Sequence, residues 1–270
     1  MKNCVKIGYG ENYINLWVKG LLVLLILLTV IPASACGKKQ ENKQILIGAA
    51  ASLKPALTEI QNVYARENPK LKLSFNFASS GTLEQQVREG SPMDLFISAA
   101  AKQMDSLEMD NLIVKETRVD LLRNEIVLIV PKESMLEMSG FNDILKASAV
   151  AVGDPESVPA GQYAKEVFEK LGIWDAVNKQ SIFGANVTEV LSWVSSGNTD
   201  AGVVYETDAK TDDGVKIVGA APAGSHSDIV YPAAVIKGRK AEKQAKAFLD
   251  FLGAEEAGEI FEKYGFTIIA

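Results

Sequence analysis

Four junctions between a loop and the start of a helix hold the residues that could do chemistry in this sequence. The segments AASLKP, ASSGTL, VPAGQY and NVTEVL each place small, hydroxyl or amide residues where a helix is expected to begin. A helix N-terminus presents unpaired N–H groups and the positive end of the helix dipole, so several such ends together could hold an anion without lysine or arginine. The candidate positions are Ser52, Ser80, Ala160 and Val187. Taken alone, each is weak evidence, because every helix needs a start and Ser52 is better explained as an ordinary N-cap.

The elements that must position these junctions alternate between strands and helices. Apolar runs at 44–50 and 94–98 and an alternation of apolar and polar residues at 71–77 predict strands. Amphipathic segments after Ser52 and Thr82 predict the helices between them. This order predicts parallel strands with helices packed outside. Beyond residue 124 the pattern starts again, with strands predicted at 125–130, 149–152, 201–205, 215–218 and 231–236 and a helix that Asn186-Val187-Thr188 opens.

Composition and motifs give other functions little support. The chain has 28 Lys and Arg residues against 34 Asp and Glu, a net charge of −6, which argues against nonspecific nucleic-acid binding. One histidine, His226, and two cysteines, Cys4 and Cys36, argue against a histidine-rich metal centre, a cysteine zinc site and a disulfide framework. No GxSxG, HExxH or P-loop motif is present, so we expect that the protein is not an enzyme.

The N-terminus has the pattern of an export signal. Residues 21–31 (LLVLLILLTVI) are too few to span a bilayer, and they lie between a lysine-containing segment and the small residues of ASAC at 33–36. ASAC resembles a bacterial lipobox, which predicts a signal peptide over 1–35, lipidation of Cys36 and a polar tether over 36–43. Because Ala33 stands where leucine is commonest, ordinary cleavage and release as a secreted or periplasmic protein remains the alternative.

Six motifs together resemble one known family. They are AAASLKPAL (49–57), FASSGTLEQQV (77–87), PMDLFISA (92–99), AVGDPESVPAGQYAKE (151–166), GVVYETDA (202–209) and YGFTI (264–268). In this order they are similar to the molybdate-binding proteins of bacterial molybdate ABC transporters, and the resemblance covers the whole chain after the signal segment.

The resemblance implies a set of ligand-binding residues. It places oxyanion-binding hydroxyls at Ser52, Ser80 and Tyr205 and oxyanion-binding backbone N–H groups at Ala160 and Val187. The molybdenum would be bound as the oxyanion, with no residue acting as a direct metal ligand and no further cofactor. A donor-only cage of this kind suits a tetrahedral dianion, which has oxygen acceptors and no proton to give.

Two neighbouring residues depart from the family pattern. Gly81 stands where the family often has a third serine, and Asn186 stands where an acidic residue is common. Neither change removes a donor to the ligand, but Gly81 is expected to loosen its loop.

The resemblance also implies an architecture and a role. We expect an α/β fold of the two-lobed periplasmic-binding-protein kind (type II, Venus flytrap), with a mixed sheet in each lobe and a two-segment hinge near Arg123 and Tyr231. Lobe 1 would use 44–123 plus 232–270, and lobe 2 would use 124–231. The protein would be an extracytoplasmic monomer that captures molybdate or tungstate, delivers it to a transporter permease and is held at the membrane by a lipid on Cys36. Another tetrahedral oxyanion such as sulfate is the alternative ligand. A ligand-sensing domain of a LysR-type regulator, which reuses this fold, is disfavoured by the export signal.

Overall fold

The structure, a computed structural model, describes residues 43–269. The predicted signal peptide over 1–35, the lipidation of Cys36 and the tether up to residue 42 lie outside the described residues and stay predictions. Among the described helices, none is long and apolar enough to cross a membrane.

Six strands form the first sheet, which with its helices is called lobe 1 here. Their order is β11-β4-β10-β3-β1-β2, and β1 pairs with β2 and β3 in parallel, as the alternating pattern predicts. The strands β10, β4 and β11 pair antiparallel, so the sheet is mixed. The elements of lobe 1 are β1 (Lys43–Ala50), η1 (Ala51–Leu53), α2 (Lys54–Glu67), β2 (Leu71–Ala78), α3 (Ser80–Arg88), β3 (Leu95–Ile97), α4 (Ala101–Met109), η2 (Lys115–Thr117), β4 (Val119–Arg123), β10 (Val230–Val235), α9 (Glu242–Leu252), α10 (Glu255–Lys263) and β11 (Thr267–Ile268).

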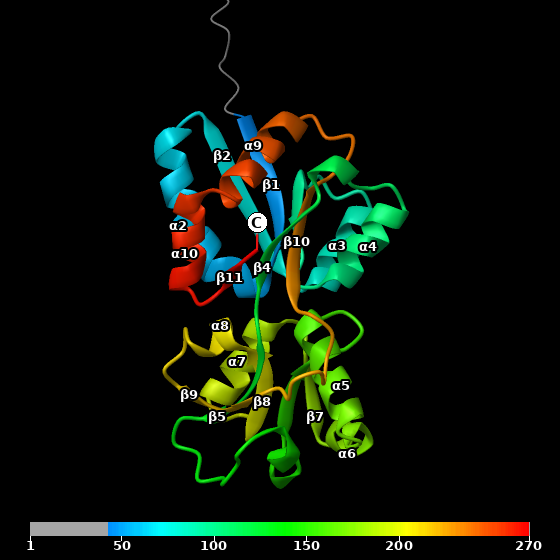
Figure 1. Cartoon of the computed structure of the whole chain (residues 1–270), viewed down its shortest axis with the longest axis vertical. Coiled ribbons are helices and arrows are strands. Elements are labelled where there is room, and N and C mark those ends of the chain that lie inside the picture. The colour runs from blue at the N-terminus through cyan, green and yellow to red at the C-terminus, as the bar shows by residue number, and fades with distance from the viewer. Residues whose placement is uncertain (1–42, 270) are drawn as a thin grey trace, which may run out of the picture. The chain divides into compact units, whose positions relative to one another are not determined.

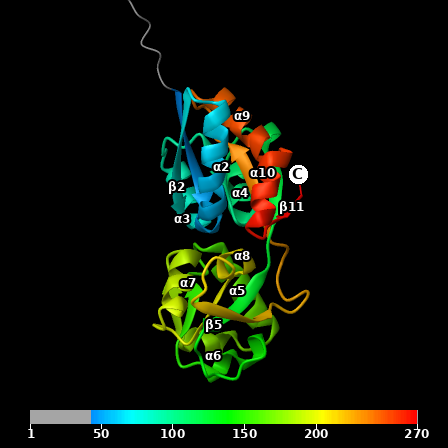
Figure 2. The same ribbon diagram turned by 90° about the vertical axis from the view of Figure 1, so that its left-hand side faces the viewer.

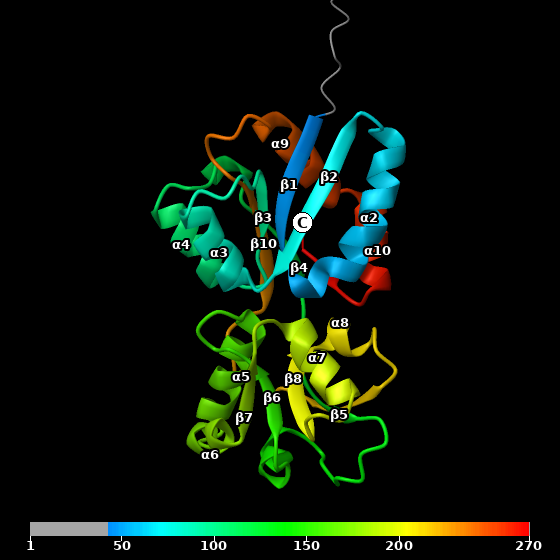
Figure 3. The same cartoon turned by 180° about the vertical axis from the view of Figure 1, so that it is seen from behind.

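Helices cover both faces of this sheet. On one face, Leu57, Ile60 and Phe248 of α2 and α9 belong to the main hydrophobic core. On the other face, Leu83 of α3 and Leu107 of α4 form a second, smaller cluster. Figures 1 and 3 show α3 and α4 on the opposite side of the sheet from α2 and α10, and Figure 2 shows α2, α9 and α10 together. The parallel strands β1 and β2 end directly before the segments that carry Ser52 and Ser80.

Five strands form the second sheet, which with its helices is called lobe 2 here. Their order is β7-β6-β8-β5-β9, with β6 parallel to β7 and β8, and β5 antiparallel to β8 and β9. Figures 1 and 3 show α5 and α6 on one side of this sheet and α7 and α8 on the other. The elements of lobe 2 are β5 (Ile126–Pro131), η3 (Phe141–Lys146), β6 (Val150–Gly153), α5 (Pro159–Lys170), α6 (Trp174–Lys179), β7 (Ser181–Gly184), α7 (Val187–Ser195), β8 (Ala201–Tyr205), α8 (Glu206–Ala209) and β9 (Val215–Ala220).

The prediction of an α/β fold with a mixed sheet in each of two lobes is confirmed. The chain leaves the first sheet where β4 ends at Arg123, enters the second where β5 begins at Ile126, and is back in the first sheet by Val230. Val230 and Tyr231 therefore already pair with β4 in lobe 1, two residues before the predicted return at 232. The division of the whole chain into 44–123 plus 232–270 and 124–231 stays a prediction.

Candidate anion-binding site

A small cavity lies where the C-terminal ends of strands and the N-terminal ends of helices from both sheets meet. Its volume is about 10 Å³, far below the roughly 300 Å³ at which pockets for drug-sized ligands begin. All five sequence-predicted residues line it, and no lysine, arginine, aspartate or glutamate does. The lining residues are Ala50, Ala51, Ser52, Ala78, Ser79, Ser80, Ala99, Val158, Pro159, Ala160, Asn186, Val187 and Tyr205.

Helix α3 leaves one backbone donor for the cavity. Its N-cap is Ser79, whose Oγ accepts the N–H of Thr82 at 3.2 Å. The N–H of Gly81 donates to the carbonyl oxygen of Ser157 in lobe 2 at 2.9 Å. Within residues 43–269 no protein acceptor takes the N–H of Ser80, which is the first residue of the helix. Buried backbone N–H groups are almost always paired. Since the Ser80 N–H has no protein acceptor here, it is available to a ligand.

Helix α5 begins in a way that also leaves one donor. Pro159 is its first residue and has no N–H, and the N–H of Gly161 donates to the carbonyl oxygen of Val158 at 2.9 Å. The N–H of Ala160 is left between them without an acceptor in the described chain. Proline at this position therefore removes a competing donor and leaves Ala160 as the donor of the first turn.

Helix α7 has a side-chain cap that does the same. Asn186 is the N-cap, and its Oδ1 accepts the N–H of Glu189 at 3.0 Å. The carboxylate of Glu189 in turn accepts the N–H of Ala185 at 2.7 Å. With these groups paired, the N–H of Val187 stays directed at the cavity end of the helix. Asn186, which departs from the family pattern, fills the capping role.

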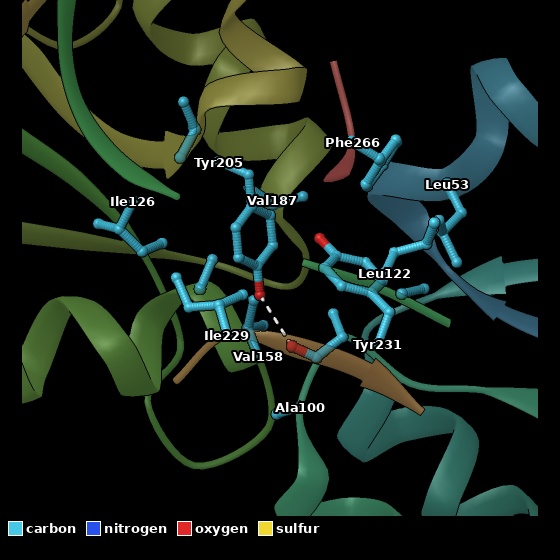
Figure 4. Packing of buried hydrophobic residues seen from close by; sticks show 14 of the residues in the cluster. Leu53, Ala100, Leu122, Ile126, Val158, Val187, Tyr205, Ile229, Tyr231 and Phe266 are labelled. Carbon is cyan, nitrogen blue, oxygen red and sulfur yellow. Dashed lines mark hydrogen bonds between the residues drawn. The ribbon is translucent and has the colours of Figure 1, made fainter. Parts of the chain in front are cut away.

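The hydroxyls of Ser80 and Tyr205 meet at the backbone of Ala99. Ser80 Oγ accepts the Ala99 N–H at 2.9 Å, so the Ser80 proton is left to donate elsewhere. The Tyr205 hydroxyl donates to the Ala99 carbonyl oxygen at 3.4 Å, a long hydrogen bond that a better acceptor could replace. Figure 4 shows this bond and the Tyr205 ring close to that of Tyr231. Complete burial raises the pKa of Tyr205 well above its ordinary value, which keeps the hydroxyl protonated as a donor.

Ser52 does not cap helix α2, and that sequence-based expectation is wrong. The helix begins at Lys54 with Leu53 as its N-cap and without a side-chain cap, because residues 51–53 form a 3-10 turn. The Ser52 Oγ instead lies 3.1 Å from the hydroxyl oxygen of Tyr231. Ser52 is 4% exposed, so this tyrosine is its protein hydrogen-bond partner in a nearly closed environment.

Gly81 lies in the first turn of helix α3, and its N–H donates to Ser157; that it loosens its loop stays a prediction. A Cβ atom at Gly81 would lie 2.5 Å from the oxygen and 2.8 Å from the Cα of Ser157. Glycine therefore permits a close approach between the two lobes at the edge of the cavity. Sequence reasoning missed this contact, and it missed Ala99 as well, because Ala99 contributes only backbone atoms and no side-chain type marks it.

No metal-ion site accompanies the cavity in the described part of the chain. Across residues 43–269 no group of three or more His, Cys, Asp or Glu side chains is placed to hold a metal ion. The arrangement can therefore surround a small acceptor with neutral donors from five elements, namely η1, α3, α5, α7 and the end of β8.

Comparisons with known proteins agree with this picture. The pattern of the family described as "Bacterial extracellular solute-binding protein" matches residues 45–267. The putative ABC transporter substrate-binding lipoprotein YvgL of Bacillus subtilis is 40% identical over 253 residues, 94% of this chain and 97% of its own. The molybdate-binding protein ModA of Haemophilus influenzae is 40% identical over 229 residues, 83% of this chain and 90% of its own.

A solved structure gives the same result. The substrate binding domain of a putative molybdenum ABC transporter from Clostridium difficile superposes with a TM-score of 0.65 and 42% sequence identity, covering 84% of this chain and 99% of that chain. The two-sheet fold with a small donor-lined cavity defines a solute-binding protein. The chain belongs to the family of bacterial extracellular solute-binding proteins.

Proposed function

We propose that the protein captures molybdate, and tungstate with it, between its lobes and delivers the oxyanion to an ABC transporter permease. The observation that carries the proposal is the convergence of Ser52, Ser80, Ala160, Val187 and Tyr205 on one neutral cavity. Relatives at 40% identity named as a molybdate-binding protein and as an ABC transporter lipoprotein support it.

The chemistry of the cavity favours a dianion that carries no proton. Molybdate offers four oxygen acceptors, and the hydroxyls of Ser52, Ser80 and Tyr205 with the N–H groups of Ala160 and Val187 offer donors. In a closed, low-dielectric site, fixed neutral donors bind such an ion strongly without a counter-ion. Phosphate is partly protonated at neutral pH, and its proton would find no acceptor in this set.

Closure of the lobes completes the cage. Ser52 and Ser80 belong to lobe 1, and Ala160, Val187 and Tyr205 belong to lobe 2. Movement about the two crossings, at 124–125 and 221–229, would separate the two sets of donors, and the ligand would favour the form in which both sets reach it. The permease would then bind the closed, loaded protein, which would act as a monomer.

We also infer that a lipid on Cys36 holds the protein at the outer face of the cell membrane. The lipobox-like ASAC sequence and the lipoprotein name of the Bacillus subtilis relative support this anchor. Cell fractionation tests it: Cys36→Ala protein should leave the membrane fraction, and unchanged membrane association would contradict the anchor.

Titration calorimetry of the purified protein with molybdate, tungstate, sulfate and phosphate tests the proposed ligand. We expect one-to-one binding of molybdate and tungstate and much weaker binding of sulfate, whose shorter bonds would leave a cage of this size under-coordinated. Preferential sulfate binding would keep the donor-only mechanism and replace the ligand. No binding of any of the four anions, by protein that has been unfolded and refolded to remove trapped ligand, would overturn the proposal.

A further inference from the structure

A chain of polar groups leads from the hinge to Ser52. Asn124 lies between β4 and β5, at the first crossing between the lobes. Its Nδ2 is 3.1 Å from the Tyr231 hydroxyl oxygen, and that oxygen is 3.1 Å from Ser52 Oγ. Tyr231 lies on β10, where the chain returns to lobe 1 at the second crossing, and its side chain is fully buried. The chain of groups therefore joins both hinge segments to a residue that lines the cavity.

Asn124 has one orientation in this chain of groups. Its Oδ1 accepts the backbone N–H of Glu125 at 2.9 Å, and an N–H can donate only to the oxygen of the amide. The Nδ2 group must then face the other way. There its two protons reach two hydroxyl oxygens, that of Thr207 at 2.8 Å and that of Tyr231 at 3.1 Å. Asn124 is thus a donor to Tyr231.

The direction of the next bond follows from the direction of the first. Tyr231 accepts from Asn124, and it has one proton of its own to place. The Tyr205 hydroxyl is a second polar neighbour of Tyr231, but it donates to the Ala99 carbonyl oxygen, and we assign the Tyr231 proton to Ser52 Oγ, 3.1 Å away. Burial raises the pKa of Tyr231 well above its ordinary value, so the hydroxyl keeps that proton. Ser52 therefore accepts from Tyr231, and its own proton is left for the cavity that it lines.

We propose that Asn124 and Tyr231 are positioning residues that make the Ser52 hydroxyl a donor toward the bound oxyanion. This inference rests on the proposed function, because it assigns the ligand an acceptor at Ser52. The backbone of Ala99 does the same for Ser80, whose Oγ already accepts the Ala99 N–H. Both serines would thus have an accepting bond to the protein and a proton to give. Successive hydrogen bonds of one direction also polarise and strengthen one another.

A double-mutant cycle for molybdate affinity tests this relay, which is the series of hydrogen bonds from Asn124 through Tyr231 to Ser52. We expect Ser52→Ala to weaken binding about tenfold or more, as for losing a hydrogen bond to a charged group, and Tyr231→Phe to weaken it about three- to tenfold. In protein that already carries Ser52→Ala, Tyr231→Phe should change affinity by less than about twofold, because its effect passes through the missing hydroxyl. Tyr64→Phe is the matched control, since Tyr64 is a buried tyrosine of the same lobe that does not line the cavity.

The outcomes separate the relay from the proposed function. The wild-type protein could bind molybdate or another tested oxyanion while Tyr231→Phe has the same effect with and without the Ser52 hydroxyl. That result would overturn the relay and leave the proposed function standing. So would an unchanged affinity of Tyr231→Phe. If the wild-type protein binds none of the four anions, the proposed function fails and the relay with it. Thermal unfolding of each variant without ligand shows whether a loss of affinity merely follows a loss of folded protein.

Asn124→Asp tests the direction of the relay with little change of shape. An aspartate can only accept at both oxygens, so the Tyr231 hydroxyl would donate to residue 124 and the Ser52 hydroxyl would donate to Tyr231. Ser52 would then present lone pairs to the ligand, and affinity should fall about as far as with Ser52→Ala. The added negative charge also weakens binding, but that effect persists in protein carrying Tyr231→Phe. Equal losses from Asn124→Asp in both backgrounds would contradict a directed relay.

Discussion

At the residue scale, the cavity combines neutral donors with acceptors that the protein itself satisfies. Ser80 accepts from Ala99, and the Oδ1 of Asn186 accepts from Glu189, so these acceptors already have donors. The protons that remain point at one small space. Cationic side chains are not needed there, because donors fixed in a low-dielectric site hold a charge more effectively than they do in water.

One acidic residue close to this region is expected to make folding depend on pH. Asp208 is buried, and its Oδ2 atom has no hydrogen-bond partner. Burial raises the pKa of this carboxyl from 3.8 to about 7. The folded protein therefore holds this proton more tightly than the unfolded chain does. Stability that is present at low pH should be lost as the pH rises from the unfolded pKa through about 7.

The variant Asp208→Asn isolates this effect. It cannot ionise, so its free energy of unfolding should rise relative to that of the wild type between roughly pH 4 and pH 7, by an amount on the order of a few kcal/mol, and the difference should level off above that range. Urea unfolding at a series of pH values measures the difference, and all other ionisable groups are common to both proteins. Parallel curves for the two proteins across this range would show that Asp208 does not titrate as its burial implies.

At the element scale, the helix starts were the most predictable features. Asn186 caps α7 as its sequence indicates, because an N-cap bond depends on residues within one turn. Ser52 looks like the same signal, yet its hydroxyl bonds to Tyr231, 179 positions away. Sequence spacing carries no information about such a partner. The serine at position 52 was therefore predicted correctly as a residue that lines the cavity. Its predicted role as an N-cap was wrong.

Elements stabilised by their neighbours were not predicted. Strand β7 (Ser181–Gly184) has two exposed apolar residues at its centre and no regular alternation, and it exists by pairing with β6. Strand β11 has two residues and depends on β4. Helix α4 buries Gln103 among its apolar residues, which obscures the periodicity on which sequence reasoning relies.

At the scale of the whole molecule, direct contacts join the two lobes around the cavity. The main hydrophobic core contains residues of both sheets, and the rings of Tyr205 and Tyr231 lie 5.8 Å apart between their centroids. Hydrogen bonds cross between the lobes at several further points. They join Gly81 to Ser157 at 2.9 Å, Tyr205 to Ala99 at 3.4 Å, Gln103 to Gln162 at 3.4 Å and Asn124 to Thr207 at 2.8 Å.

The contact at Gly81 has no room for a side chain, so it should decide whether the lobes can close fully. Ser157 is held in place by Asp154, which accepts from both its N–H and its hydroxyl at 3.1 Å. A Cβ at position 81 would meet backbone atoms of Ser157 at 2.5 and 2.8 Å, and neither can move aside cheaply. Alanine fits the helical backbone of α3 itself and has the higher helix propensity. The steric conflict of Gly81→Ala therefore belongs to the closed form alone.

We expect Gly81→Ala to weaken molybdate binding about tenfold or more, mainly through faster dissociation, because the closed form is the one that the ligand stabilises. Stopped-flow dissociation and calorimetry measure the effect, and thermal unfolding without ligand should show no comparable loss of stability. Gly253→Ala is the matched control, since a Cβ there would have its nearest neighbour at an ordinary 3.7 Å. Wild-type affinity and dissociation rate in Gly81→Ala would show that the approach of Gly81 to Ser157 is not required for holding the ligand. A large loss of stability without ligand would instead mean that the two lobes stay in contact at Gly81 whether or not the cavity is filled.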